Sequence, residues 1–205
     1  MEFLDRHVFP HINDLVLGRQ VAALRSEIAG AASGRVLEIG AGTGLNFDAY
    51  KAGVEVVAIE LAEGMRRRAI ERSRRPGLRA AVSVLDGDAR SLPFDAGSFD
   101  SVVSTFVLCS VRKLDICLAE ARRVLRPNGK LCLVEHVRSP NAATARWQDR
   151  VRPLWQTLLG GCDPTRDIGR ALEVAGFDVS ALSRIELPLP WLAKPGISGV
   201  LAPRG

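Results

Sequence analysis

The chain has 205 residues, of which 47% are hydrophobic and 25% charged, and its formal net charge at pH 7 is +5. This composition is typical of a globular protein and excludes an intrinsically disordered chain, and the length fits one domain with a sizeable core. Aromatic residues make up only 5% of the chain. We therefore expect no stacking surface for single-stranded nucleic acid and no nucleic-acid partner.

The sequence predicts neither a metal centre nor an integral membrane anchor. The four cysteines include no Cys-x-x-Cys pair and no His/Cys spacing typical of a metal finger, which predicts free, mostly buried thiols in a reducing compartment. The first ten residues include Glu2 and Asp5 and lack the apolar core of a signal peptide. No run approaches the roughly 18 apolar residues of a transmembrane helix. We expect a cytoplasmic protein and leave a peripheral membrane contact open.

The segment from residue 2 to about residue 29 has apolar residues at helical spacing, with Pro10 as a break or kink. We expect residues 1–30 to cover the mouth of a binding site as a helical lid. Short apolar runs then predict strands at residues 35–39, 54–59, 80–85, 99–105 and 130–137. Helices are predicted between them at residues 62–75 and 114–125, the second ending in a turn over residues 126–129, RPNG.

Strands and helices alternate from residue 35 to residue 137, which indicates βαβ units and a parallel sheet with both faces covered and its strands buried. Beyond Pro140 we expect a helix carrying Trp147 and Trp155 and another at residues 165–175. Residues 177–187 follow, and then a last short apolar stretch near residues 197–201. We expect a single domain over residues 1–205, with a cofactor-binding half at 35–137 and an acceptor-side half at 138–205. Seven arginines between residues 66 and 79 are interpreted as the solvated face of one helix.

The stretch VLEIGAGTG has three glycines at alternate positions behind an apolar run. In an open parallel sheet, ligands bind beyond the C-terminal strand ends, and glycines there let a ligand lie against the backbone. Gly40, Gly42 and Gly44 are therefore predicted to form the floor of a cofactor site. Leu45 replaces the last glycine of the dinucleotide fingerprint G-x-G-x-x-G, which disfavours a nicotinamide-dependent dehydrogenase. Glu38 would repel a pyrophosphate and suits a cationic cofactor with an amino-acid tail.

Two more acids follow strand ends. Glu60 ends the second strand, where an acid accepts hydrogen bonds from both ribose hydroxyls of a nucleoside. Asp88, in LDGDA, follows the third strand and is a candidate acceptor for the exocyclic amine of an adenine. Leu61 and Met65 are placed to sandwich the adenine ring.

Five motifs follow one another along the chain. They are E-x-G-x-G-x-G, a strand-final Glu, GDA, the strand FDSVVSTF and the phrase EARRVLRPNGKLCLVEH. Together they resemble the class I S-adenosylmethionine-dependent methyltransferases over nearly the whole chain. The resemblance implies an α/β fold with a seven-stranded Rossmann-like sheet of order 3-2-1-4-5-7-6, a last strand that is antiparallel, and helices on both faces. It implies S-adenosyl-L-methionine as cofactor and S-adenosyl-L-homocysteine as product. The expected cofactor-binding residues are Glu38, Gly40, Ala41, Gly42, Gly44, Asn46, Glu60, Leu61, Met65, Gly87, Asp88, Ala89, Thr105 and Phe106.

Methyl transfer from a sulfonium is an in-line displacement of an activated leaving group, so positioning dominates and no metal is needed. The acceptor pocket is expected above the fourth and fifth strands, where His136, Cys109 and Glu135 are the candidate catalytic residues. His136 is the best base, because its unperturbed pKa is about 6.5. It could equally be a hydrogen-bonded histidine at a strand end, and Cys109 a small buried apolar residue. A thiol acceptor needs only to be a thiolate, so a base is helpful but not obligatory.

The phrases TFVLCSV, LWQTLLGGCDPTRD and LPLPWLAKPGISGVL resemble the methyltransferase-like thiol S-methyltransferases, whose animal members are membrane-anchored and methylate small alkyl thiols. From its sequence we expect this chain to differ from them in lacking a hydrophobic N-terminal anchor. A small, lipophilic thiol is the favoured acceptor. N-methylation of a phospholipid amine and methylation of a quinone-like or other small molecule remain alternatives, as does a non-catalytic module that only binds S-adenosylmethionine. The oligomeric state is left open.

Overall fold

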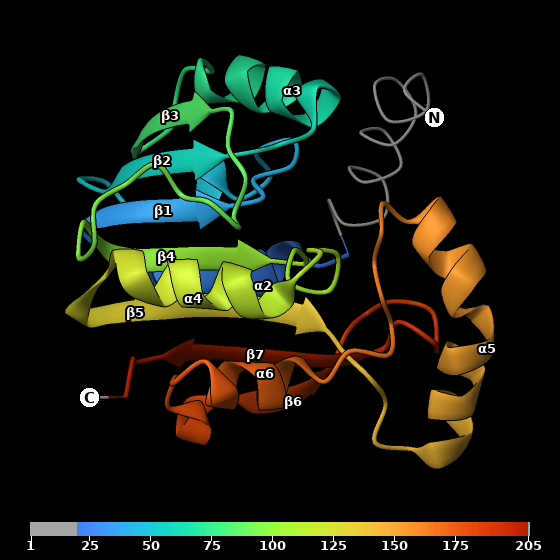
Figure 1. Ribbon diagram of the computed structural model, residues 1–205. Coiled ribbons are helices and arrows are strands. Elements are labelled where there is room, and N and C mark those ends of the chain that lie inside the picture. The colour runs from blue at the N-terminus through green and yellow to red at the C-terminus, as the bar shows by residue number, and fades with distance from the viewer. Residues whose placement is uncertain (1–19, 205) are drawn as a thin grey trace.

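The computed structural model of the protein describes residues 20–204. Its centre is a seven-stranded sheet of order β3-β2-β1-β4-β5-β7-β6 (Figure 1). The pairs among β1 to β5 are parallel, and β7 is antiparallel to both β5 and β6. The strands are β1 (Arg35–Ile39), β2 (Glu55–Ile59), β3 (Ala81–Leu85), β4 (Phe99–Thr105), β5 (Leu125–His136), β6 (Ser183–Glu186) and β7 (Pro195–Leu201). The sheet order and the antiparallel last strand are confirmed.

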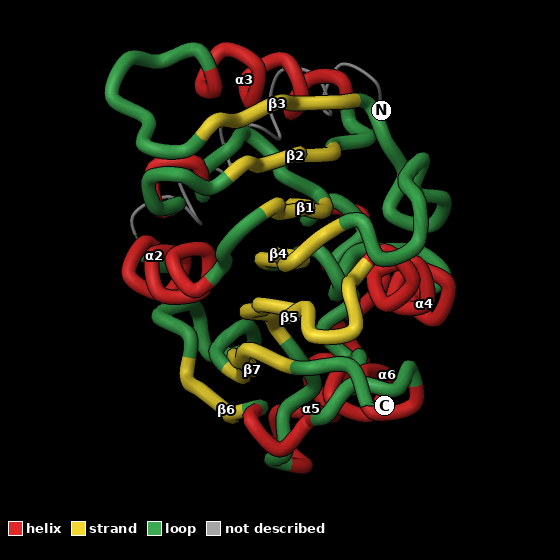
Figure 2. The backbone as a smooth tube through the Cα atoms, turned by 90° about the vertical axis from the view of Figure 1, so that its left-hand side faces the viewer, coloured by secondary structure: helices red, strands yellow, loops and turns green. Residues whose placement is uncertain are grey.

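Helices cover both faces of this sheet, as predicted. They are α2 (Ala22–Ala31), α3 (Glu63–Ser73), α4 (Leu114–Val124), α5 (Ala142–Leu158) and α6 (Ile168–Val174), with the 3-10 turns η2 (Phe47–Ala49) and η3 (Val179–Ala181). Figure 2 shows α2 on one side of the sheet and α4 with α6 on the other. In Figure 1, α5 stands beside the edge at which the parallel strands end. None of the helices within residues 20–204 combines the length and apolarity needed to cross a bilayer.

The apolar strands supply a core on each face, because successive side chains of a strand point to opposite sides. On the α4 and α6 face, Leu118 and Leu172 pack against the sheet. On the α2 face, Ile28 and Phe47 do so. The edge strand β3 departs from the prediction of buried strands, because its residues alternate between exposed and half-buried. A strand at the edge has a neighbour on one side only, and Leu85 is 42% exposed.

The predicted turn after α4 lies inside β5. Leu125 already pairs with Phe99, and the regular ladder resumes where Lys130 faces Ser101, so residues 126–129 bulge out opposite Asp100. Proline and glycine in this stretch interrupt the ladder hydrogen bonds, which explains a bulge in place of a separate turn. The Arg126 guanidinium donates to the Asp100 carboxylate across the bulge.

Residues 1–19, which make up most of the expected lid, lie outside the described residues. The remainder of that segment forms α2, which packs on the sheet: Val21, Ile28 and Ala29 are all buried. α2 contacts β4, β5 and β7. This part of the segment is therefore an element of the core.

The sheet order makes the end of β1 the point at which the chain connections diverge. β1 lies between β2 and β4, so the chain crosses to one side of β1 for β2 and β3 and to the other side for β4 and β5. In open α/β sheets, ligands bind where the connections diverge in this way, at the C-terminal strand ends. The glycine loop that follows β1 lies at this place.

Candidate active site

The loop after β1 has a backbone that favours glycine. Gly40, Gly42 and Gly44 all have positive φ angles, of 61°, 59° and 80°. A Cβ on Gly40 would come within 2.6 Å of a methyl carbon of Val107, so the loop lies directly against the segment that follows β4. Ala41 is buried and its N–H donates to the carbonyl of Ile59 at 3.0 Å, which ties the loop to the end of β2. The expected floor of the cofactor site is thus a tight, backbone-lined turn.

Glu38, two residues before the loop, is almost completely buried. Its Oε1 accepts from Asn46 Nδ2 at 2.9 Å, and its Oε2 accepts from the Tyr50 hydroxyl at 2.7 Å. Asn46 Nδ2 also donates to Thr105 Oγ1 at 2.9 Å. Arg25, from α2, donates to Asn46 Oδ1 and Thr105 Oγ1 at 3.2 and 3.3 Å. This buried network joins α2, β1, the glycine loop and the end of β4.

Burial raises the pKa of the Glu38 carboxyl to about 7, although hydrogen bonds from Tyr50 and Asn46 and the nearby Arg25 charge act in the opposite direction. A group with this pKa is mostly neutral at pH 6 and mostly ionised at pH 8. An ionised Glu38 attracts a cationic ligand, whereas the neutral acid does not. The charge that the site presents therefore changes across the neutral range.

Affinity for S-adenosylmethionine is expected to rise about three- to tenfold between pH 5.5 and pH 7.5, as the Glu38 carboxyl ionises. Calorimetric titrations at several pH values measure this. The Glu38→Gln variant should show a flat profile. Binding of 5′-methylthioadenosine to the wild type should also be independent of pH, because this ligand has the nucleoside but no cationic tail. An equally steep profile in Glu38→Gln would assign the titration to another group.

Glu60 lies at the end of β2 and already holds two backbone segments. Its Oε2 accepts from the N–H of Gly42 and its Oε1 from the N–H of Ala62, both at 2.8 Å. Burial raises the pKa of this carboxyl, while these N–H donors act in the opposite direction. Arg66 is not merely solvated as expected, because it donates to the carbonyl of Glu60 at 2.9 Å and pairs with Asp86. The carboxylate thus stands between the glycine loop and the start of α3.

The two apolar residues predicted beside the adenine differ in exposure. Leu61 is 61% exposed at the end of β2, so it has a free surface for a ring. Met65 is only 5% exposed and packs inside the protein. Gly87 lies close to β2, since a Cβ there would meet Ile59 at 3.1 Å. Ala89 packs against the core on the α4 face.

Asp88 is occupied by a neighbouring arginine. Arg90 Nη2 donates to Asp88 Oδ2 at 2.6 Å, and the Arg90 N–H donates to Oδ1 at 2.9 Å. The Arg90 guanidinium holds the pKa of the Asp88 carboxyl below its ordinary value. Both side chains are about one third exposed, at 31% and 35%. Acceptance from an adenine amine, as predicted for Asp88, therefore requires sharing the carboxylate with Arg90.

Phe106 follows β4 in a left-handed conformation, with φ of 58°. Such a φ costs a non-glycine residue roughly 1–2 kcal/mol. Its N–H donates to the Val134 carbonyl at 2.9 Å, and the Arg25 guanidinium lies 5.7 Å from the centre of its ring. Thr105, next to it, belongs to the network around Glu38. Both residues lie at the C-terminal end of β4, and their contact with the cofactor stays a prediction.

Glu135 explains how this turn is held. It is fully buried, and its Oε1 accepts from Ser104 Oγ at 2.8 Å and from the N–H groups of Val107 and Leu108 at 3.0 Å each. Its Oε2 accepts from the N–H of Cys109 at 3.3 Å. Burial raises the pKa of Glu135, with these donors acting in the opposite direction. All four contacts are internal, so the geometry is that of a residue that positions the loop after β4.

His136 is also committed to internal contacts. It is 4% exposed, its Nε2 lies 3.2 Å from the carbonyl oxygen of Leu192, and its Nδ1 lies 3.6 Å from Cys162 Sγ. A carbonyl oxygen can only accept, so Nε2 carries the proton and Nδ1 is the basic nitrogen in the neutral ring. The base predicted from the sequence thus faces a cysteine.

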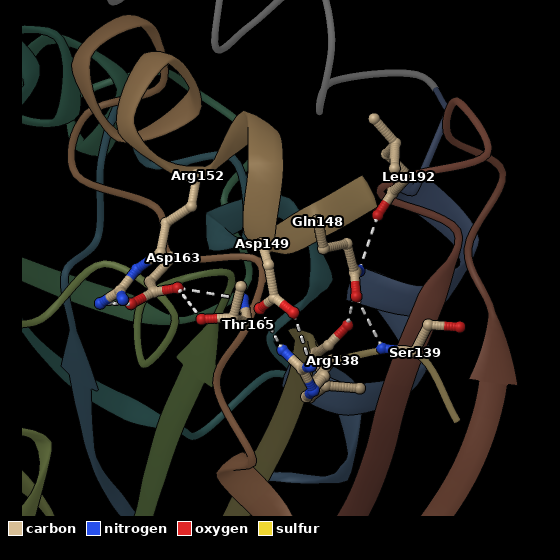
Figure 3. Close-up of polar contacts among 9 residues, drawn as sticks. Arg138, Ser139, Gln148, Asp149, Arg152, Asp163, Thr165 and Leu192 are labelled. Carbon is tan, nitrogen blue, oxygen red and sulfur yellow. Dashed lines mark hydrogen bonds and ion pairs between the residues drawn. The ribbon is translucent and has the colours of Figure 1, made fainter. Parts of the chain in front are cut away.

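Figure 3 shows the network that supports Leu192. Gln148, on α5, is fully buried; its Nε2 donates to Leu192 O at 2.9 Å and its Oε1 accepts from Ser139 N at 2.8 Å. Arg138 pairs with Asp149 at 2.6 Å. These contacts join α5 to the end of β5 and to the segment before β7.

Cys109 is 2% exposed, and all four cysteines are free, as expected. The hydrogen bond with Cys162 and then burial raise the pKa of the Cys109 thiol well above its ordinary value. Cys162, on the segment between α5 and α6, is partly exposed. It was not among the predicted site residues.

Sequence reasoning also missed Arg25, Tyr50 and Gln148. The role of Arg25 could have been suspected from the sequence, because this charged residue interrupts the apolar stripe between Val21 and Ile28. A charged residue on a buried helix face is usually paired and often belongs to a site. Tyr50 and Gln148 have no such sign, because their roles depend on partners from other elements.

The site fits a cationic nucleoside cofactor better than a dinucleotide. Two buried or half-buried carboxyls, Glu38 and Glu60, flank the glycine loop. A pyrophosphate against these groups would meet like charge, whereas ribose hydroxyls and an ammonium group would be accepted. Leu61 provides an exposed apolar surface beside them.

Comparisons with known proteins agree with a site for a cationic nucleoside cofactor. A family model described as a methyltransferase domain matches residues 37–133. The chain is 37% identical over 188 residues to human thiol S-methyltransferase TMT1A, an alignment that covers 88% of this chain and 76% of that protein. A phosphatidylethanolamine N-methyltransferase of Cereibacter sphaeroides is 37% identical over 52% of each chain.

Among solved structures, a methyltransferase of Thermotoga maritima described as a possible histamine N-methyltransferase covers 98% of both chains with a TM-score of 0.69. At 19% identity this likeness shows the fold. With the extended match to TMT1A and the family model, it identifies the chain as a class I S-adenosylmethionine-dependent methyltransferase, an enzyme whose cofactor is S-adenosyl-L-methionine.

Proposed function

We propose that this enzyme transfers the methyl group to the sulfur of a small, lipophilic thiol. One observation carries the proposal: the two bases expected on the acceptor side are engaged within the protein. Glu135 accepts four internal hydrogen bonds, and His136 contacts Leu192 and Cys162. A thiol ionises by itself to a few per cent at neutral pH and reacts as the thiolate, so it needs no such base.

The alternatives need more from the protein. An amine such as that of a phospholipid headgroup is almost fully protonated at neutral pH and must lose a proton before it can attack. The similarity to a phosphatidylethanolamine N-methyltransferase supports an amine acceptor, but this match covers only about half of the chain. The match to the thiol S-methyltransferase extends over 88% of the chain and thus into residues 138–205, the half expected to choose the acceptor.

The chain's residues would act mainly by position. The glycine loop and Glu60 would hold the nucleoside, with Glu60 accepting from the ribose hydroxyls and Glu38 supplying negative charge for the amino-acid tail. The bound cofactor supplies a methyl group on a positively charged sulfur. Glu135 would keep the turn at Phe106 and Cys109 in place beside it. The catalytic roles predicted for His136, Cys109 and Glu135 stay predictions, and so does a cytoplasmic location.

An acceptor panel with methyl-labelled S-adenosylmethionine tests the proposal. The panel holds alkyl thiols, sulfide, phosphatidylethanolamine and a demethylated quinone. We expect label on an alkyl thiol. Label on the lipid amine or the quinone alone would keep the family assignment and reject the thiol.

The pH profile makes the test sharper. With two alkyl thiols of different pKa and saturating cofactor, kcat/KM should rise about tenfold per pH unit up to the pKa of each thiol. The two profiles should therefore be displaced from one another. Profiles that bend at one common pH for both thiols would instead indicate a base on the enzyme. The His136→Asn variant would then show whether that base is the histidine.

A further inference from the structure

Three reactive side chains from distant parts of the chain meet beyond β5. Cys109 follows β4, His136 ends β5, and Cys162 lies between α5 and α6. Cys162 Sγ is 3.6 Å from His136 Nδ1. The N–H of Asp163 donates to the carbonyl of Cys109 at 2.8 Å, so the two segments that carry the cysteines run side by side. Each thiol also shifts the pKa of the other, as expected of two groups that lie close together.

The protonation of His136 directs the chemistry of Cys162. Leu192 O accepts from both Gln148 Nε2 and His136 Nε2, so the histidine proton is held on Nε2. The free lone pair on Nδ1 then faces the Cys162 thiol and can take its proton. The Trp155 ring stacks on the imidazole, with centroids 6.0 Å apart and planes at 30°. This arrangement favours the Cys162 thiolate, the form in which a cysteine reacts.

The electrostatic surroundings support an unequal pair of thiols. Interaction with Cys109 and then with His136 holds the pKa of Cys162 well below its ordinary value, while the pKa of Cys109 is raised. Asp163, the next residue, is paired with Arg152 at 2.7 Å and lies 3.9 Å from Arg166. Within residues 20–204, no group of His, Cys, Asp and Glu is arranged to hold a metal ion.

We propose that Cys162 and Cys109 form a redox-active dithiol that reacts with small organic disulfides. Cys162 is the attacking group, because it is partly exposed and its Sγ lies 3.6 Å from His136 Nδ1. Cys109 is the resolving group, the thiol that attacks the mixed disulfide on Cys162. At 2% exposure it is shielded from a disulfide in solution and can react only with a group inside the protein.

The reaction balances without a further reagent. The Cys162 thiolate forms a bond to one sulfur of R–S–S–R and expels RS⁻, which takes the proton held by His136. Cys109 then loses its proton to His136, attacks Cys162 Sγ and expels a second RS⁻, which takes that proton. Two protein thiols and one disulfide become one protein disulfide and two RSH molecules. The two electrons pass from the cysteines to the small disulfide.

The new bond would join the turn after β4 to the segment between α5 and α6. Glu135 holds the first of these segments through the Val107, Leu108 and Cys109 N–H groups. The other cysteines do not share these features: burial raises the pKa of Cys117 to about 12 and that of Cys132 to about 11. They are matched controls.

The full-length protein is treated with bis(2-hydroxyethyl) disulfide, and its intact mass is measured. We expect the wild type to lose two hydrogens without an adduct and to release two molecules of 2-mercaptoethanol, reversibly with reductant. Cys109→Ser should retain a stable mixed disulfide that peptide mapping places on Cys162. Cys162→Ser should react at least tenfold more slowly, and Cys117→Ser should behave like the wild type. A wild type that keeps an adduct, or Cys109→Ser that traps none, would overturn the proposal.

A second measurement needs no substitution of a cysteine. The rate of alkylation of Cys162 by iodoacetamide should change less than about twofold from pH 6.5 to 8, because the thiolate is already formed. In His136→Asn the rate should rise about tenfold per pH unit, as for an ordinary thiol. A wild-type rate with that same steep rise would overturn the proposal. Neither assay uses cofactor or methyl acceptor, so either can fail independently of the proposed thiol methylation.

Discussion

Replacing Glu135 with alanine is expected to lower the free energy of unfolding by about 3–5 kcal/mol. Three backbone N–H donors, those of Val107, Leu108 and Cys109, lose their acceptor, and an unsatisfied buried donor costs about 1–3 kcal/mol. Relief from burying the carboxyl, whose pKa is raised, and water entering the vacated space offset part of this cost. Urea denaturation followed by circular dichroism measures the change.

Two variants make this result specific to the hydrogen bonds. Glu173→Ala removes an exposed acid that pairs with Arg170, and it should change stability by less than about 1 kcal/mol. Glu135→Gln keeps an oxygen for the three donors that meet Oε1, but its amide nitrogen would face the N–H of Cys109. Its loss should therefore lie between those of the other two variants. If Glu135→Ala and Glu173→Ala were equally stable, Glu135 would not hold the loop after β4 in the way inferred here.

Replacing Glu60 with alanine is expected to weaken S-adenosylmethionine binding roughly ten- to 150-fold, or about 1.5–3 kcal/mol, the size of hydrogen bonds to a charged group. The physical reason is the loss of the carboxylate that accepts from the ribose. Glu60 also accepts from the N–H groups of Gly42 and Ala62, so part of the loss would come from the glycine loop. Isothermal titration calorimetry measures the affinity, with Glu71→Ala, an exposed acid on α3, as the control.

A cofactor analogue separates the two contributions. In the wild type, S-adenosylmethionine that lacks the ribose 2′-hydroxyl should bind more weakly than the natural cofactor. In Glu60→Ala this difference should largely vanish, because the partner of the hydroxyl is gone. If the analogue keeps its full disadvantage in the variant, Glu60 acts on the loop and the ribose assignment is wrong.

The pairing of Asp88 with Arg90 is local along the chain and could have been predicted from the sequence. Arg90 is two residues away and takes up the carboxylate through contacts that are local along the chain. The bulge at residues 126–129 is similar, because Pro127 and Gly129 are visible in the sequence as interruptions. What the sequence leaves open there is whether the chain turns away or rejoins its neighbour strand. The pairing of Leu125 with Phe99 decides that.

The sheet, the glycine loop and the strand-end acids Glu38 and Glu60 could be predicted from the amino-acid sequence. These features depend on runs of adjacent residues, and parallel strands bring their C-terminal ends to one edge whatever the packing detail. The contacts of Glu135, His136 and Cys162 depend on the packing of distant segments and could not be predicted in this way. His136 meets Leu192 from 56 residues away and Cys162 from 26 residues away. No local periodicity encodes such contacts, because they depend on how α5 and the segments around it pack against the end of β5.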